Sequence, residues 1–279
     1  MNLLCSKLRK PFETKKVIKL ITGIDNLDIS NILSMTKSAE LSGVTYIDTI
    51  ASTRVVKLLK SFSSLPICVS SIDPVELFNC VTVGVDLIEI GNFAFCYKQG
   101  IYLTAWEILK LAKEIRSLAS NIDICVTIPY YLPLDKQINL AQDLECIGIN
   151  ILQTESIFIK NRVSVPNLLH NNLFNFFDSS CLSLLSCYII SKHVSLPILA
   201  SSSMNNFSSC LSLSMSASGI GIGSTVNTYG DIPQMSCYLR SLRYLIDSVN
   251  VNPSFKVRNA LEELSYNLED FYTTNSVII

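Results

Sequence analysis

Three charged side chains interrupt apolar segments of this sequence, and their chemistry suits acid–base or carbonyl reactions. Lys19 stands in Ile-Lys-Leu, Asp48 in Ile-Asp-Thr and Glu89 in Ile-Glu-Ile. A charge buried without a partner is costly, so each side chain needs a partner or access to water. Carboxylates transfer protons, and a lysine whose pKa is lowered by burial can act as a base or form a Schiff base. We therefore take these three residues as the candidate catalytic set.

Each of the three also has a structural interpretation. Asp48 and Glu89 could share a layer inside one fold, where Lys19 pairs with either of them as a structural ion pair. Asp48 also stands near the end of its apolar run, where it could cap the segment that follows. The residues alone leave both interpretations open.

A second candidate site is the segment from Ser218 to Asn227, in which Gly-Ile-Gly-Ile-Gly precedes Ser-Thr. The pattern predicts a short buried strand, a tight turn and the start of a helix. Free backbone N–H groups at a helix start attract anions. We expect a phosphate group to bind at Gly221, Gly223, Ser224 and Thr225. The alternative is that the glycines only allow a strand and a helix to pack closely.

Eight apolar runs of strand length alternate with helical segments along the chain. They do not alternate with polar residues, which is typical of parallel strands buried on both faces. The runs span residues 17–22, 44–48, 66–70, 85–90, 124–128, 149–153, 196–200 and 219–223. Eight such units predict a single (β/α)8 TIM barrel of the α/β class, and 279 residues suit the roughly 250 of that fold. The competing fold, an open doubly wound sheet, usually carries its glycine-rich turn after the first strand.

The predicted domain plan is a short N-terminal extension, the barrel, and a C-terminal helix with a tail. Their ranges are 1–16, 17–249 and 250–279, and the last contains an expected helix over 257–268. Helices are expected over 53–62, 104–118, 134–145, 181–191 and 231–249, with others starting at Asp28 or Ser30 and at Asp73-Pro74. The 104–118 helix should bury Trp106, Leu109, Ile115 and Leu118. A long connection is expected over 156–179.

The barrel fold would bring the polar residues of different strands together. Functional side chains of such barrels lie at the carboxyl ends of the strands, and alternate strands share an interior layer. We therefore expect Lys19, Asp48 and Glu89 to face the interior or its carboxyl-end mouth. The expected ligand contacts that follow the strands are Asn92, Thr127, Gln153, Glu155, Ser201 and Ser202. His170 is expected in a solvated loop, and His193 precedes the seventh strand without a role.

Composition argues against several classes of protein. The net charge of −1 and a charged fraction of 16% give no basic surface for nucleic acid. No apolar run reaches the length of about 18 residues that a membrane span needs, and residues 1–12 lack the apolar core of a secretory signal. The ten cysteines form no CxxC pair, and the two histidines share no metal-ligand spacing. We expect reduced cysteines and no metal site; cofactor and oligomeric state stay open.

Several of these segments, in this order, resemble a family of plastid and cyanobacterial proteins known as hypothetical chloroplast open reading frame twenty-three. The resemblance rests most strongly on Ile88-Glu89-Ile90-Gly91-Asn92-Phe93 and Gln153-Thr154-Glu155. The other matching segments are 19–23, 46–48, 66–71, 126–129, 132–135 and 221–227. Two positions depart from the family pattern: Ser202 and Ser203 follow Ala200-Ser201 where a glycine is expected, and Ser156-Ile157 replaces Gly-Gly.

The resemblance implies an aldolase-type barrel located in the plastid stroma. The sequence is more distantly similar to phosphate-binding barrels of thiamine, histidine and tryptophan biosynthesis. Together with the residues above, it predicts an enzyme of lyase, isomerase or synthase type that acts on a small phosphorylated metabolite. The alternative is a non-catalytic or regulatory barrel that binds a flavin or a nucleotide phosphate. The two lost glycines favour this alternative, because they reduce close backbone approach to an anion.

Overall fold

The strands of this protein close into a complete ring. The computed structural model describes residues 3–91, 93–156 and 172–249. Within them, eight parallel strands pair in chain order, and β8 pairs with β1 to close the barrel. The strands are β1 Val17–Ile21, β2 Tyr46–Ile50, β3 Ile67–Ser71, β4 Leu87–Ile90, β5 Asp123–Ile128, β6 Ile151–Thr154, β7 Ile198–Ala200 and β8 Gly219–Ile222. The predicted (β/α)8 fold is confirmed.

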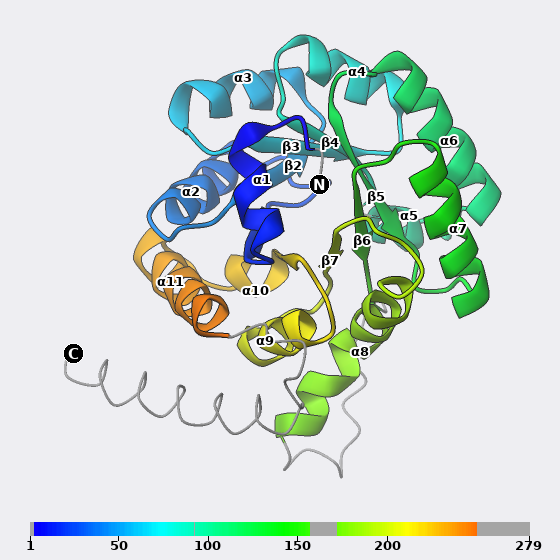
Figure 1. Cartoon of the computed structure of the whole chain (residues 1–279). Helices are drawn as coiled ribbons and strands as arrows, with labels where there is room; N and C mark the ends of the chain where they lie inside the picture. Colours follow the sequence, from blue (N-terminus) through cyan, green and yellow to red (C-terminus); the bar gives the residue numbers. More distant parts are fainter. Residues whose placement is uncertain (1–2, 92, 157–171, 250–279) are drawn as a thin grey trace.

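Helices surround the ring of strands (Figure 1). They are α1 Ser6–Glu13, α2 Ile29–Glu40, α3 Thr53–Phe62, α4 Pro74–Thr82, α5 Ala94–Lys98, α6 Ala105–Leu118, α7 Leu134–Cys146, α8 Asn172–Ile190, α9 Asn206–Ser214, α10 Ser224–Asn227 and α11 Ile232–Ser248. Predicted caps hold at two starts: Asp28 accepts hydrogen bonds at the start of α2, and Asp73 does so before Pro74 in α4. None of the helices in the described ranges is both long and apolar enough to cross a membrane.

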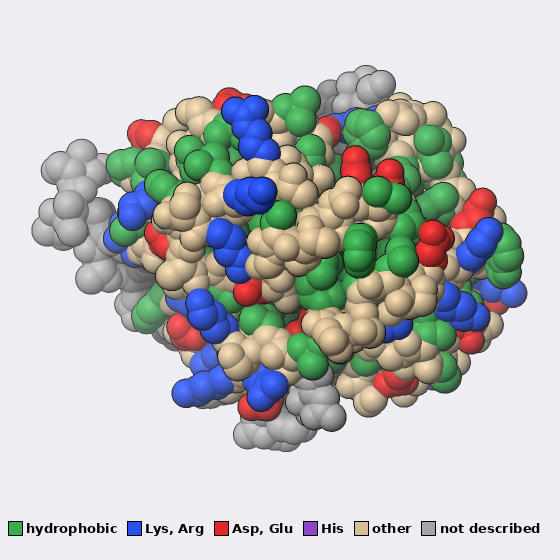
Figure 2. All heavy atoms as spheres, turned by 90° about the horizontal axis from the view of Figure 1, so that it is seen from above, with side chains coloured by type: hydrophobic (Ala, Val, Ile, Leu, Met, Phe, Trp, Pro, Cys, Tyr) green, Lys and Arg blue, Asp and Glu red, His purple; other side chains and the backbone are tan. Residues whose placement is uncertain are grey.

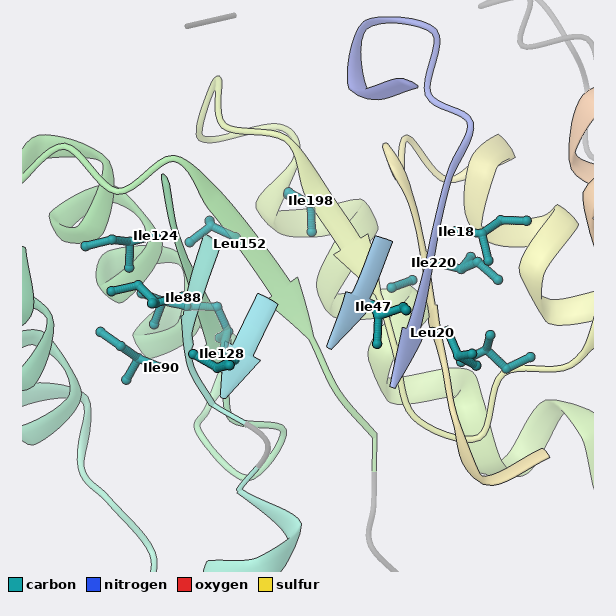
Figure 3. Packing of buried hydrophobic residues seen from close by; sticks show 14 of the residues in the cluster. Ile18, Leu20, Ile47, Ile88, Ile90, Ile124, Ile128, Leu152, Ile198 and Ile220 are labelled. Carbon is teal, nitrogen blue, oxygen red and sulfur yellow. The ribbon is translucent and has the colours of Figure 1, made fainter. Parts of the chain in front are cut away.

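The largest apolar core lies between the strands and the helices. Figure 3 shows side chains such as Ile18, Leu20 and Ile220, which come from the outward faces of β1 and β8. They pack with buried residues of the helices, including Met35 of α2. Because side chains alternate along a strand, Ile18 and Leu20 on the outer face direct Lys19 between them into the barrel.

Helix α1 covers the amino-terminal end of the barrel, where Figure 1 shows it lying across the ring. Its buried Leu8 and Phe12 form a second core with interior residues of the strands, including Tyr46 and Leu87. The backbone N–H groups of Leu4 and Cys5 donate to the buried carboxylate of Asp123, at 3.0 and 2.8 Å. The segment predicted as an extension therefore covers the amino-terminal end of the barrel.

Three expectations about the helices were wrong. Helix α6 buries Ile108, Ala112 and Ile115, whereas Trp106 is 67% exposed and lies beside Lys110. Helix α8 begins at Asn172, within the expected connection, and the serine-rich helix α9 was not expected at all. Serine is a modest helix former, so burial against the barrel rather than propensity sets these two helices. The expected helix over 257–268 lies outside the described residues.

On the face of the molecule shown in Figure 2, Lys and Arg side chains are interspersed with Asp and Glu and with scattered hydrophobic groups. This face shows no large patch of one charge, in agreement with the near-zero net charge of the sequence.

Candidate functional site

The predicted catalytic residues meet inside the barrel as one ion-paired network. Lys19 Nζ lies 3.1 Å from Asp48 Oδ2 and forms a still closer ion pair with Glu89 Oε2. It also donates a hydrogen bond of 2.9 Å to Gln153 Oε1. Their strands, β1, β2, β4 and β6, direct these side chains to the barrel axis. The structure thus confirms the predicted direction of the three charged residues.

Neutral side chains complete the network. Ser70 of β3 donates to Asp48 Oδ1 at 2.6 Å, and Thr127 of β5 donates to Glu89 Oε1 at 3.0 Å. Gln153 Nε2 donates to the same Glu89 oxygen at 2.8 Å. The carboxylate of Glu89 therefore has partners on both oxygens, which offsets much of the cost of its burial.

The network holds its lysine in the charged form. Burial alone lowers the pKa of Lys19, but the carboxylates of Asp48 and Glu89 outweigh it and raise that pKa well above its usual value. The expected lowered pKa of a Schiff-base lysine is therefore wrong. Burial also raises the pKa of Asp48, to about 6, although Lys19 opposes the shift. Asp48 is not a cap: it lies within β2, and Ser52 caps the following helix α3.

The network is closed to solvent. Lys19 and Glu89 are 0% exposed, and neither borders the open pocket of the barrel. The backbone of Gly91 lies directly against the network, because a Cβ there would come within 2.9 Å of Glu89 Oε1 and 2.3 Å of Thr127 Oγ1. Thr127 and Gln153, expected as ligand contacts, belong to this sealed layer. Asn92 and His170 lie outside the described residues.

A pocket of about 790 Å³ opens at the carboxyl end of the barrel, beside the last strands. Most of the predicted ligand contacts line it. They are Glu155, Ser201, Ser202, Gly221, Gly223 and Ser224. Thr225 does not line it; its hydroxyl donates to the Met204 carbonyl oxygen at 3.0 Å. The sequence therefore located the pocket, although it expected the charged network to share it.

The glycines in β8 and directly after it allow neighbouring segments of the barrel to pack closely. A Cβ at Gly219 would come within 2.4 Å of the Val17 side chain, and one at Gly221 within 2.8 Å of Ser201 Oγ. A Cβ at Gly223 would lie 2.5 Å from the Ile21 carbonyl oxygen. The alternative reading of the glycines is thus supported. The same missing side chains leave room for the pocket, since Gly221 and Gly223 line it.

The turn after β7 keeps the backbone shape expected of a glycine. Ser202 has φ 70° and Ser203 has φ 55°, both in the left-handed region. Residues other than glycine adopt that region at a cost. The two serines thus occupy a left-handed turn whose shape favours glycine.

Among the predicted contacts that line the pocket, Glu155 is a buried carboxyl group with a raised pKa. Its Oε1 accepts a short hydrogen bond from the Tyr97 hydroxyl and a longer one, 3.4 Å, from the Tyr130 N–H. Burial raises the pKa of Glu155 to about 8, and these two donors only partly oppose it. At neutral pH the carboxyl group is therefore mainly protonated.

Sequence reasoning missed two elements of the pocket. Tyr97 of α5 lines it, and the rings of Tyr130 and Tyr131, shortly after a predicted strand, pack against Tyr97. Lys98 also lines the pocket and forms an ion pair with Asp25 across 2.6 Å. Across the described parts of the chain, His, Cys, Asp and Glu side chains form no group of three suited to a metal ion.

Comparison with known proteins agrees with the resemblance seen in the sequence. The family model described as "Protein of unknown function (DUF561)" matches residues 4–252. "Uncharacterized protein ycf23" of Antithamnion sp. is 43% identical over 242 residues, which cover 86% of this chain and 87% of the relative. The protein of that name from Porphyra purpurea is 35% identical and covers 87% and 89% of the two chains.

Solved structures share the fold at low identity. The geranylgeranylglyceryl phosphate synthase of Thermoplasma acidophilum, solved with sn-glycerol-1-phosphate, has a TM-score of 0.58 at 12% identity and covers 89% of this chain and all of its own. Thiamine phosphate pyrophosphorylase of Pyrococcus furiosus has a TM-score of 0.54 at 15% identity, with coverage of 84% and 96%. A 3-hexulose-6-phosphate synthase gives 0.56 at 13% identity, with coverage of 81% and 99%.

Proposed function

We propose, for a chain that belongs to the DUF561 family together with the ycf23 proteins, that it is an enzyme acting on a small phosphorylated metabolite. The reaction would be of lyase, isomerase or synthase type. The single observation that carries this proposal is the pocket at the carboxyl ends of β6 to β8, which combines backbone and hydroxyl donors with the buried acid Glu155.

The proposed phosphate position lies between the turns that follow β7 and β8. Ser201 and Ser202 line the pocket next to Gly221, Gly223 and Ser224. The loops after the seventh and eighth strands commonly hold phosphate in this fold. Three solved neighbours have names that include phosphorylated compounds, and these likenesses support the same choice of ligand class.

For Lys19, Asp48 and Glu89 we propose an indirect role in the reaction, because these buried residues do not line the pocket. They adjoin residues that line the pocket: Gly221 pairs with Lys19 in the barrel register, and Ile21, two residues after Lys19, pairs with Asp48. Their charges balance to one net negative unit when both carboxyl groups are ionised. This set supports the pocket electrostatically and would carry carbonyl chemistry only if a ligand reached through the Gly91 and Ile21 layer.

Ligand titration followed by NMR tests the phosphate position. sn-Glycerol-1-phosphate should shift the backbone amide signals of residues 221–225 at millimolar concentration. Ser224 is exposed, so its substitution leaves the core intact. Ser224→Asp places a negative charge at the cradle and should weaken binding at least tenfold, whereas the neutral Ser224→Asn should bind like the wild type. Amides that do not respond, or two variants that bind alike, would contradict the proposal.

A second function is favoured by the sealed network. Because Lys19 and Glu89 are fully buried, a non-catalytic barrel that binds a flavin or a nucleotide phosphate in the same pocket is the alternative proposal. Turnover of a sugar phosphate by the purified protein would support the enzyme, and a flavin or nucleotide carried through purification from its own host without turnover would support the alternative. For either function we propose the plastid stroma, on the resemblance to plastid-encoded proteins and the algal relatives.

A further inference from the structure

We propose that Glu155 is the acid of this pocket and donates its carboxyl proton to an oxygen atom of the bound ligand. The inference rests on the proposed function, because it assumes an anionic small molecule in the pocket. It goes further by naming a proton donor and the side chain that supports it. Glu155 would be a catalytic residue, and Tyr97 a positioning residue.

The first argument is the place of Glu155 in the barrel. It follows β6 directly and lies two residues beyond Gln153, so both side chains belong to the interior side of the same segment. Gln153 is taken up by the sealed network, whereas Glu155 lines the pocket while remaining only 6% exposed. Glu155 is thus a carboxyl group with access to a ligand but with little access to water.

The second argument is the kind of partner that Glu155 has. In the described parts of the chain, the ion pairs do not include Glu155, in contrast to Glu89 with Lys19. Its donors are the neutral Tyr97 hydroxyl and Tyr130 N–H, and both reach Oε1. In the protonated form of Glu155, Oε1 would act as the carbonyl oxygen that accepts both hydrogen bonds, and Oε2 would carry the proton.

The third argument is the rigidity of Tyr97. Its ring stacks on Tyr102 with centroids 5.3 Å apart, and Tyr130 and Tyr131 meet it edge-on at 5.5 and 5.6 Å. The Tyr131 hydroxyl is itself tied to the Leu103 carbonyl oxygen. Such a cluster holds the Tyr97 hydroxyl in position at Glu155, and a supporting group must be held in this way if it is to assist proton transfer.

The proposed step balances without a further reactant. The O–H bond of Glu155 breaks, and an O–H bond forms on the ligand, so the ligand gains one positive charge and Glu155 one negative charge. The hydrogen bonds from Tyr97 and Tyr130 then stabilise the carboxylate. Reversal of the same transfer restores the acid.

The surrounding groups set the direction of the pH dependence. Tyr97 and Cys96 of α5, Tyr130 and Tyr131 after β5, and Glu89 of β4 are the titratable groups that act on Glu155. The paired Lys98 and Asp25 lie on the rim of the same pocket. The hydrogen bonds from Tyr97 and Tyr130 favour ionisation of Glu155, whereas burial and the negative charge of Glu89 oppose it.

The test titrates the full chain with its glutamate side-chain carboxyl carbons labelled with ¹³C. One signal should titrate near pH 8 and be absent from Glu155→Gln, while Glu114→Gln, at an exposed site on α6, should retain it. Tyr97→Phe removes a donor to the carboxylate and should move the midpoint upward, whereas the exposed Tyr244→Phe should not. A signal for Glu155 that titrates below pH 6 would overturn the proposal.

Sulfate then tests the contact with a ligand, because it stays doubly charged across the pH range used. If sulfate binds beside protonated Glu155, its affinity should fall about tenfold from pH 7 to pH 9 as the carboxyl ionises. The affinity of Glu155→Gln should change by less than about twofold. An equal fall in both proteins would overturn the proposal. If sulfate shifts no amide of residues 221–225, the proposed phosphate position fails instead, and the midpoint of Glu155 alone then decides between an acid near pH 8 and an ordinary carboxylate.

Discussion

The barrel buries two glutamates in two different ways. Glu89 is paired with a cation, Lys19, and accepts hydrogen bonds from two further donors, Thr127 and Gln153. Glu155 lies one layer higher, with neutral donors and an opening to the pocket. The same side chain is thus paired with a cation in one place and with neutral donors in the other.

This difference shows that burial alone does not identify a reactive group. A cation beside a buried carboxylate stabilises the ionised form, so such a pair mainly serves the fold rather than proton transfer. A buried carboxyl group with only neutral partners keeps a pKa near physiological pH, which is the range in which acids catalyse most efficiently. Two substitutions test the two sides of this contrast, and two more test the backbone that surrounds the pocket.

Removal of the cation should have the largest effect. Lys19→Met leaves Asp48 and Glu89 buried together without a counter-charge, and we expect a loss of about 3–5 kcal/mol in the free energy of unfolding. Urea denaturation measures it. Lys60→Met is the control, since the pair of Lys60 with Asp86 lies at the surface and should contribute less than about 1 kcal/mol. The addition of Glu89→Gln should recover part of the loss; a single variant as stable as the control would mean that the network is not an ion-paired one.

The pH dependence of stability should change next most. The folded-state pKa of Glu155, about 8, exceeds its usual value of 4.5, so its stabilisation is complete below about pH 4.5 and is lost as the pH rises to about 8. The slope is about 1.4 kcal/mol per pH unit. Glu155→Gln should remove this slope, so the variant should gain roughly 3 kcal/mol relative to wild type between pH 5.5 and 7.5. Parallel stability curves for the two proteins across that range would refute the raised pKa.

The packing role of β8 predicts a smaller loss. Gly223→Val drives a side chain into the Ile21 backbone, and we expect about 1–3 kcal/mol of destabilisation from the forced shift. Gly230→Val meets nothing within 4 Å and serves as the control. Thermal unfolding of both variants compares them. If Gly223→Val is as stable as the control, the glycine serves the ligand rather than the fold.

The turn after β7 should show the smallest effect, and with the opposite sign. Ser202→Gly removes the cost of a left-handed serine but adds flexibility to the unfolded chain, so the net gain should be about 0.5 kcal/mol. Ser63, with φ −132°, has no such cost, and Ser63→Gly should not stabilise. A destabilised Ser202→Gly would show that the serine side chain, rather than the turn, is what the fold needs.

The sequence was sufficient for the architecture because each strand is a short, continuous apolar run. It located Lys19 and Glu89 because a charge in such a run is rare, and it located Gly221 to Ser224 by their order after the last strand. Whether those charges reach the pocket depends on Gly91 and on the tilt of the strands. A short stretch of sequence predicts neither of these. Tyr97 was missed because one tyrosine in a five-residue helix gives no periodic signal.

Helix α1 has a consequence for the order in which this chain can become native. Its partners come late in synthesis: Asp123 follows Leu4 by 119 residues, and its core also includes Ile151 and Leu199. Helix α1 precedes all of these strands in the chain, and its core is complete only when β5, β6 and β7 have been made. Contacts so distant in sequence are slow to form. Tyr46 and Leu87 can pack against Leu8 and Phe12 earlier, but the seal at this end of the barrel is finished only by the later strands.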